Sequence, residues 1–190
     1  RFYFENMRVF DRQAYGREAG LEVLMGAELN ILNETGKVDL EEKALNSLDY
    51  AIASLHKQCI EPGTVLENTT AIISAMANPY VKIIGHPDNP TYPVDFDALA
   101  RAAKENHVLL ECNNSSYRSS GSRAGSRETA KVMLAACKKY GTHVIMGSDA
   151  HIDLDVGNHT GSQEVLAQAD FPEELVINAS PEKFKEWIRR

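Results

Sequence analysis

The sequence predicts an α/β fold in which βα units are arranged around a largely parallel sheet, and two observations support this. Short apolar runs typical of strands alternate with longer amphipathic stretches typical of helices. The ends of the apolar runs recur roughly every 30 residues, which is the size of a βα unit. Because no shift in composition interrupts this period, we expect a single domain over residues 1–190.

Six apolar runs are expected to form strands, at residues 21–28, 48–56, 81–86, 107–112, 142–147 and 175–177. Helices are expected between them, and residues 8–19 form a helix ahead of the first strand. Capping signals mark four further helices: Thr64 begins one that runs to about Ala77, Asp95 one to Asn106, Ser126 one to Tyr140 that Gly141 closes, and Ser180-Pro181 the last.

Composition and charge exclude several classes of protein. The chain has 27 acidic and 20 basic residues, a formal charge of −7, which argues against a general nucleic-acid binder. No apolar run approaches the roughly 20 residues of a membrane helix, and no secretory signal is visible, so no membrane partner is expected. Cys59, Cys112 and Cys137 are too widely spaced for a disulfide framework or a zinc knuckle. A reducing, cytoplasmic location is therefore expected.

Side chains able to bind metal occur where the expected strands end. These are Glu28, His56 and His86, followed by Asp149 and His151 just past the fifth run. In α/β barrels the carboxyl ends of the strands carry the active site, because the loops converge there. Asp149 and His151 are two apart, so in an extended segment both side chains leave the same face. His86 precedes Pro87, which favours an extended backbone at the tip of its strand.

The residue types suit catalysis by a bound metal. A carboxylate and two neutral imidazoles, from Glu28, His56 and His86, leave a coordination position open for water, as catalytic zinc sites do. Such water can attack phosphorus or a carbonyl carbon. Glu28 has two oxygens and could bridge to a second ion held by Asp149. A single histidine at a strand end is more often part of the core or a loop than a ligand, and it is the joint pattern that favours a metal site.

A polar loop over residues 111–127 follows the fourth run and enters a helix. Its amide, hydroxyl and guanidinium donors, among them Asn113, Arg118 and Arg123, are suited to binding the phosphate of a substrate. A flexible polar loop explains the same composition equally well. The sequence leaves both interpretations open.

Five motifs of the chain resemble the PHP domain, the polymerase and histidinol phosphatase superfamily, and in particular its stand-alone bacterial YcdX-type phosphatases. They occur in family order at residues 26–30 (GAELN), 54–56 (SLH), 85–90 (GHPDNP), 111–116 (ECNNSS) and 147–151 (GSDAH). The resemblance implies a distorted TIM-like barrel of seven βα units. It also implies a site for up to three divalent ions, zinc, manganese or iron, that hydrolyses phosphate esters.

Carried over to this chain, the resemblance implies that Glu28 bridges two ions and that His56 and His86 complete the second of them. Asp149 would bind the first ion and His151 the third. Members of the superfamily open with a His-x-His strand followed by two further histidines. The resemblance implies that these four histidines lie upstream of Arg1. We therefore expect an N-terminally incomplete PHP domain whose first strand is missing, with low activity on its own.

The favoured function is that of a metal-dependent phosphoesterase, in which metal-activated water held by the five ligand residues hydrolyses a small phosphomonoester. Two alternatives remain: a metal-dependent amide or lactone hydrolase, and a catalytically incomplete PHP module with a structural or regulatory role. The sequence names neither the substrate nor the metal, and it is compatible with a homo-oligomer.

Overall fold

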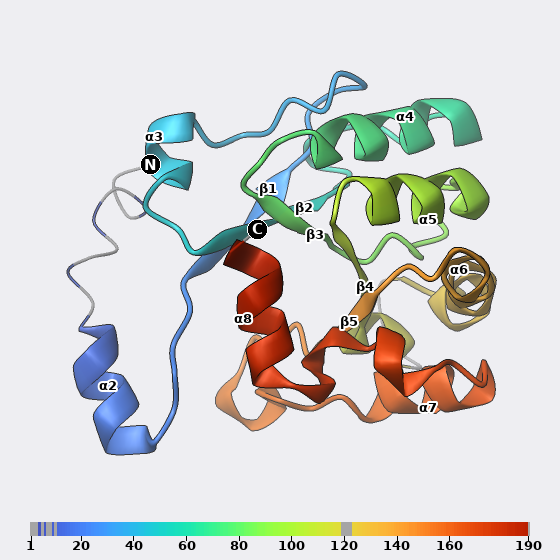
Figure 1. Ribbon diagram of the computed structural model, residues 1–190. Helices are drawn as coiled ribbons and strands as arrows, with labels where there is room; N and C mark the ends of the chain where they lie inside the picture. The colour runs from blue at the N-terminus through green and yellow to red at the C-terminus, as the bar shows by residue number, and fades with distance from the viewer. Residues whose placement is uncertain (1–3, 5, 7–8, 10, 119–122, 190) are drawn as a thin grey trace.

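A computed structural model describes residues 4, 6, 9, 11–118 and 123–189, and in it five parallel strands form one sheet (Figure 1). The strands follow one another across the sheet in sequence order, which is the arrangement that consecutive βα units produce. They are β1 (Gly26–Asn30), β2 (Tyr50–Ser54), β3 (Val81–Ile84), β4 (Leu109–Asn113) and β5 (Val144–Gly147). The predicted α/β class with a parallel sheet is confirmed.

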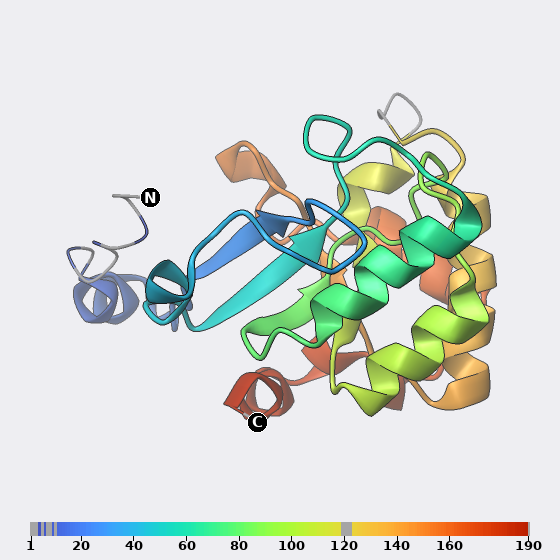
Figure 2. The same ribbon diagram turned by 90° about the horizontal axis from the view of Figure 1, so that it is seen from above.

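Helices alternate with the strands along the chain. The described α-helices are α2 (Arg12–Ala19), α3 (Glu42–Leu45), α4 (Val65–Met76), α5 (Phe96–Glu105), α6 (Ser126–Tyr140), α7 (Thr160–Gln168) and α8 (Pro181–Arg189). Short 3₁₀ turns are η2 (Asn114–Tyr117), η3 (Asp153–Asp155), η4 (Glu173–Leu175) and η5 (Ile177–Ala179). Helices α4 to α7 lie along one side of the sheet, and α8 lies apart from them near its opposite face (Figures 1 and 2). The sheet is thus covered on both faces, as parallel sheets usually are.

Residues of the strands alternate between two apolar clusters. Ala51 and Ala53 of β2 belong to the larger cluster, which includes buried residues of α4, α5 and α6. Tyr50 and Ile52 face the smaller cluster, together with Phe184 of α8. This two-residue alternation is the pleat of a strand, so each face of the sheet has its own core.

Helix α8 covers the smaller core near the amino ends of the strands. The ring of Trp187 stacks on His107 with 3.6 Å between centroids, and Phe184 meets Tyr50 edge to face. Along β4 the same face carries Leu109, then Glu111, then Asn113, because side chains two apart share a face. The face is therefore apolar beside α8 and becomes polar toward the carboxyl ends of the strands.

Most of the predicted helix ends are confirmed. Thr64 and Glu67 form a reciprocal capping box at the start of α4, and Asp95 accepts the N–H of Ala98 at the start of α5. Gly141 ends α6 in the left-handed conformation. The predicted cap of α6 is wrong by one residue: Gly125, with φ of 94°, is the N-cap and Ser126 is the first helical residue. The left-handed backbone there suits glycine, which has no Cβ.

The sixth predicted strand, residues 175–177, is wrong. The structure has 3₁₀ turns before and after Val176, which alone pairs with Val144 of β5 in an isolated parallel bridge. The side-chain amide of Asn178 accepts the N–H of Met146 at 3.2 Å and donates to its carbonyl at 3.0 Å. A side chain thereby satisfies the backbone groups of β5 that a sixth strand would have paired.

The described residues form a five-stranded sheet that is compatible with a TIM-like barrel, and the expected seven units stay a prediction. The first strand lies further along the chain than predicted, at Gly26–Asn30 rather than at residues 21–28, and the N–H of Met25, just before it, donates to the carboxylate of Asp49 at 2.6 Å. Because β1 continues to Asn30, Glu28 lies in its middle and not at its end. Among the described helices, none combines the length and apolarity needed to cross a bilayer.

We predict that Asn178→Ala lowers the free energy of unfolding by about 1–3 kcal/mol, because it leaves the N–H and C=O of Met146 without their partner. Denaturant unfolding followed by circular dichroism measures the change. The control Gln168→Ala removes an exposed amide side chain and should change stability by less than about 0.5 kcal/mol. Equal losses in the two variants would contradict the role given to Asn178.

Candidate metal centre

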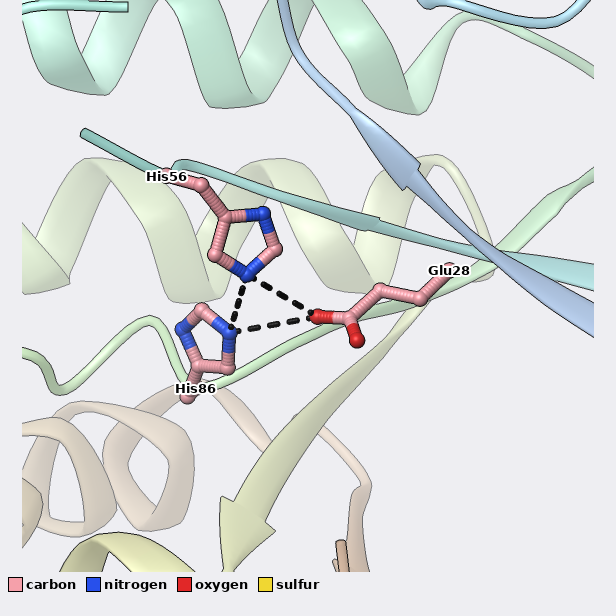
Figure 3. Close-up of side chains that lie close together, drawn as sticks. All are labelled: Glu28, His56 and His86. Atoms are coloured by element: carbon pink, nitrogen blue, oxygen red, sulfur yellow. Dashed lines mark hydrogen bonds and ion pairs between the residues drawn. The ribbon is translucent and has the colours of Figure 1, made fainter. Parts of the chain in front are cut away.

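Three side chains from neighbouring strands converge at the carboxyl end of the sheet. Glu28 projects from the middle of β1, while His56 and His86 each lie two residues beyond the ends of β2 and β3. Because the strands are parallel and adjacent, their carboxyl ends bring these side chains to one point (Figure 3). Within the described part of the chain, this is the one group of three acidic, histidine or cysteine side chains close enough to hold an ion.

The three facing atoms form a nearly regular triangle. Glu28 Oε1 lies 3.2 Å from His86 Nε2 and 3.4 Å from His56 Nε2, and the two Nε2 atoms are 3.2 Å apart (Figure 3). A tetrahedral zinc ion with bonds of about 2.0 Å holds its ligand atoms about 3.3 Å apart. The spacing of the donor atoms therefore fits a first-row divalent cation.

Hydrogen bonds around His56 fix the orientation of its ring. Asn30 Nδ2 donates to Asp39 Oδ2 at 2.5 Å, so the amide oxygen of Asn30 faces His56 Nδ1, at 2.7 Å. An oxygen at that position requires the proton of the neutral imidazole to be on Nδ1. Nε2 is then a lone-pair donor pointing into the triangle, as metal binding requires.

The charge states of the group also suit a cation. Contacts with the side chains of His56 and then His86 hold the pKa of Glu28 well below its usual range, so Glu28 is a carboxylate. Burial lowers the pKa of His86, whose side chain is 3% exposed, and this favours the neutral imidazole. The negative charge of Glu28 and the neutral nitrogen of His86 thus face the same point, beside His56 Nε2.

Pro87 led us to expect an extended backbone at His86, but the backbone there is not extended. Its φ is 33°, in the left-handed region that residues with a Cβ seldom adopt. Its N–H donates to Glu111 Oε2 at 2.9 Å. The backbone conformation at this ligand position is thus determined by tertiary contacts and not by the local sequence.

Asp149 and His151 are not brought into the triangle. Asp149 has φ of 49°, so the segment is not extended as expected, although Asp149 Oδ1 still lies 3.7 Å from His151 Nδ1. The carboxylate of Asp149 lies 3.4 Å from Arg123 Nη1. His151, whose side chain is 83% exposed, pairs through Nδ1 with the carbonyl of Asp149 at 3.0 Å.

The polar loop after β4 contains the three residues expected to contact a substrate, and they differ in their surroundings. Asn113 is 2% exposed, and its amide donates to Glu111 and accepts from Ser116. Arg118 is paired with Asp155 at 2.8 Å. Arg123 donates to the hydroxyl of Ser116 and lies beside Asp149. Residues 119–122 of this loop lie outside the described residues.

Comparisons with known proteins give a consistent result. The chain is 46% identical over 188 residues to a probable phosphatase of Clostridium acetobutylicum. The aligned region covers 99% of this chain and 75% of that protein. The chain is 42% identical over 188 residues to one of Clostridium novyi and 42% identical over 189 residues to one of Acetivibrio thermocellus, covering 75% and 76% of those proteins. The chain belongs to this family of probable phosphatases. No protein-family model matches the chain.

Solved structures support the fold of this probable phosphatase family member. A chain in the cryo-EM structure of archaeal ribonuclease P with mature tRNA aligns with 96% of this chain and 74% of its own length, with a TM-score of 0.63 at 18% identity. The crystal structure of an uncharacterized protein aligns with 93% of this chain and 47% of its own, with a TM-score of 0.52 at 13% identity. At these identities the likeness concerns the fold alone.

Two residues around the triangle of this probable phosphatase had no role in the sequence-based hypothesis. Asn30 orients His56, and Glu111 binds the backbone of His86. Burial raises the pKa of Glu111 to about 7. The signal available in the sequence was a polar side chain two residues from the candidate ligand Glu28, and an acidic residue inside the apolar run of β4.

A second buried carboxyl group connects the loop after β3 to the turn after β4. Asp88, which is fully buried, accepts a hydrogen bond from the hydroxyl of Tyr117 at 2.7 Å. Burial raises the pKa of Asp88 to about 7. The contact links the segment of His86 to η2, and hence to the loop that carries Arg123.

We predict that Asn30→Ala shifts the neutral His56 ring from the Nδ1–H form toward a mixture of both tautomers, because the acceptor at Nδ1 is lost. Long-range ¹H–¹⁵N spectra of the histidine side chains measure the tautomer in the metal-free protein. The control Asn106→Ala, at the carboxyl end of α5, should leave the His56 signals unchanged. Unchanged His56 signals in Asn30→Ala would contradict the assignment.

Proposed function

We propose that the protein is a metal-dependent phosphoesterase of the PHP superfamily, similar to the YcdX-type phosphatases, that hydrolyses a small phosphomonoester. The names of its relatives support phosphatase activity, and the five motifs of the sequence support the superfamily. The cluster of Glu28, His56 and His86 supports a site for a metal ion that would activate water. We treat residues 1–190 as part of one catalytic domain.

One observation carries the proposal: Glu28 Oε1, His56 Nε2 and His86 Nε2 lie 3.2–3.4 Å from one another with no intervening side chain. Three atoms with lone pairs repel each other at this distance unless a proton or a cation lies among them. A carboxylate with two imidazoles suits zinc, manganese and iron. We assign these residues as ligands of one divalent ion.

A bound divalent cation would supply an activated water and neutralise charge on the phosphate oxygens. The protein's own contribution is to hold the ligands in place and to bind the substrate. Arg123 lies beside Asp149 with 18% of its side chain exposed, and a guanidinium can bind two phosphate oxygens at once. We assign Arg123, with Arg118 as a second cation on the same loop, to the phosphate group of the substrate.

Asp149 and His151 remain proposed ligands for further ions, up to three in all, as the resemblance implies. Both follow β5, and β5 ends at the same edge of the sheet as β2 and β3. The chain spans about three quarters of the length of its curated relatives. The test below therefore measures binding of the one ion that Glu28, His56 and His86 could hold, in addition to activity.

We predict that the protein binds about one zinc ion at the triangle and that His86→Ala weakens this binding roughly 100-fold or more, because one of three ligand atoms is lost. Isothermal titration with zinc measures the affinity. Hydrolysis of p-nitrophenyl phosphate with added zinc or manganese, measured beside simple esters, amides and lactones, identifies the reaction. The phosphomonoester should be the preferred substrate, and His86→Ala should reduce its turnover to background.

The control is His159→Ala, which removes a histidine at the start of α7, outside the triangle. It should bind zinc as the parent does. Zinc binding and phosphatase activity retained in His86→Ala would refute the assigned ligand. Preferred cleavage of an amide or lactone would replace the phosphoesterase proposal with the alternative hydrolase.

A further inference from the structure

The carboxylate of Glu111 contacts the backbone of His86, and the proposed function gives this carboxylate no role. We propose that Glu111 is a positioning residue: by accepting the N–H of His86, it anchors the peptide group from which the left-handed backbone directs the His86 ring into the triangle. The metal-binding part of this inference rests on the proposed metal site at Glu28, His56 and His86.

The contacts of Glu111 are specific and buried. Glu111 Oε2 accepts the backbone N–H of His86 at 2.9 Å and the Asn113 amide at 3.2 Å. Glu111 is 8% exposed and lies in the middle of β4, so its backbone is fixed by pairing with Ile145 of β5. A rigid strand thus presents a hydrogen-bond acceptor to the loop that follows the neighbouring strand β3.

The acceptor is needed because the backbone of His86 is unusual. Its φ of 33° is disfavoured for a residue with a Cβ, and the following Pro87 favours an extended conformation instead. An extended backbone would redirect the ring relative to the peptide group that carries this N–H. The hydrogen bond to Glu111 fixes that peptide group, which makes the acceptor part of what keeps His86 Nε2 3.2 Å from Glu28.

The sheet also makes room for this carboxylate. A Cβ placed on Gly147 of β5 would lie 2.0 Å from Glu111 Oε1, and its three nearest atoms all belong to the Glu111 side chain. Gly147 is not among the residues with positive φ, so its backbone does not itself require glycine. We infer that glycine stands at 147 because the Glu111 carboxylate occupies the space where a side chain would be.

The first test uses the metal-free protein and measures amide hydrogen exchange at His86. In Glu111→Ala the His86 amide should exchange about tenfold faster or more, because its acceptor is gone. Glu111→Gln retains an oxygen that can accept from both His86 and Asn113, so exchange should stay within about threefold of the parent. The matched control Ser162→Ala removes a buried hydrogen bond to the carbonyl of Cys112 in the same strand and should leave His86 protected.

The second test measures zinc affinity by titration. Glu111→Ala should weaken binding about 10–100-fold, whereas Glu111→Gln and Ser162→Ala should remain within about threefold of the parent. Gly147→Ala should weaken binding to a similar degree, because the added methyl group displaces the carboxylate. In the Glu111→Ala background the same Gly147→Ala change should have less than about a threefold effect, since the clash is gone.

Three results would overturn the inference: unchanged His86 exchange and zinc affinity in Glu111→Ala, a loss in Glu111→Gln as large as in Glu111→Ala, or an equal loss in Ser162→Ala. The last would reduce Glu111 to a general contributor to stability. Absence of zinc binding by the parent protein would instead refute the proposed metal site. The exchange measurements would then still decide whether Glu111 holds the backbone of His86.

Discussion

The candidate site depends on a parallel sheet that places three atoms with lone pairs within 3.4 Å of one another. Glu28, His56 and His86 come from consecutive parallel strands, and only the side-by-side register of those strands brings them together. Their mutual repulsion favours any cation that enters the triangle. In this family of probable phosphatases, the arrangement is a physical reason to expect metal-assisted chemistry.

Each histidine of the triangle is held by a different kind of contact. His56 is oriented through its ring, by Asn30 and, behind Asn30, by Asp39. His86 is oriented through its backbone, by a carboxylate from the neighbouring strand. A loop residue otherwise has many conformations, so both contacts reduce the entropy that binding of an ion would cost. The smaller apolar core, beside α8, stabilises the strands from which these contacts are made.

The sequence allowed much of the fold to be predicted, because periodicity and caps are local properties. The capping box of Thr64 and Glu67, the cap at Asp95 and five of the six strands were within reach of such patterns. The sixth strand failed because Asn178 satisfies the backbone of β5 with a side chain. No local pattern reveals a contact between residues 32 positions apart.

For the site, the sequence by itself determined the donors: Glu28, His56 and His86 stand at or near the ends of predicted strands, and their chemistry suits a divalent cation. Only the tertiary structure decided how they meet. It placed His86 and Asp149 in left-handed conformations, where the sequence had predicted an extended backbone. It also brought the carboxylate of Glu111 to the backbone N–H of His86. The physical reason is that backbone conformation beyond a strand end follows from contacts with neighbouring strands, which the order of residues along one strand does not contain.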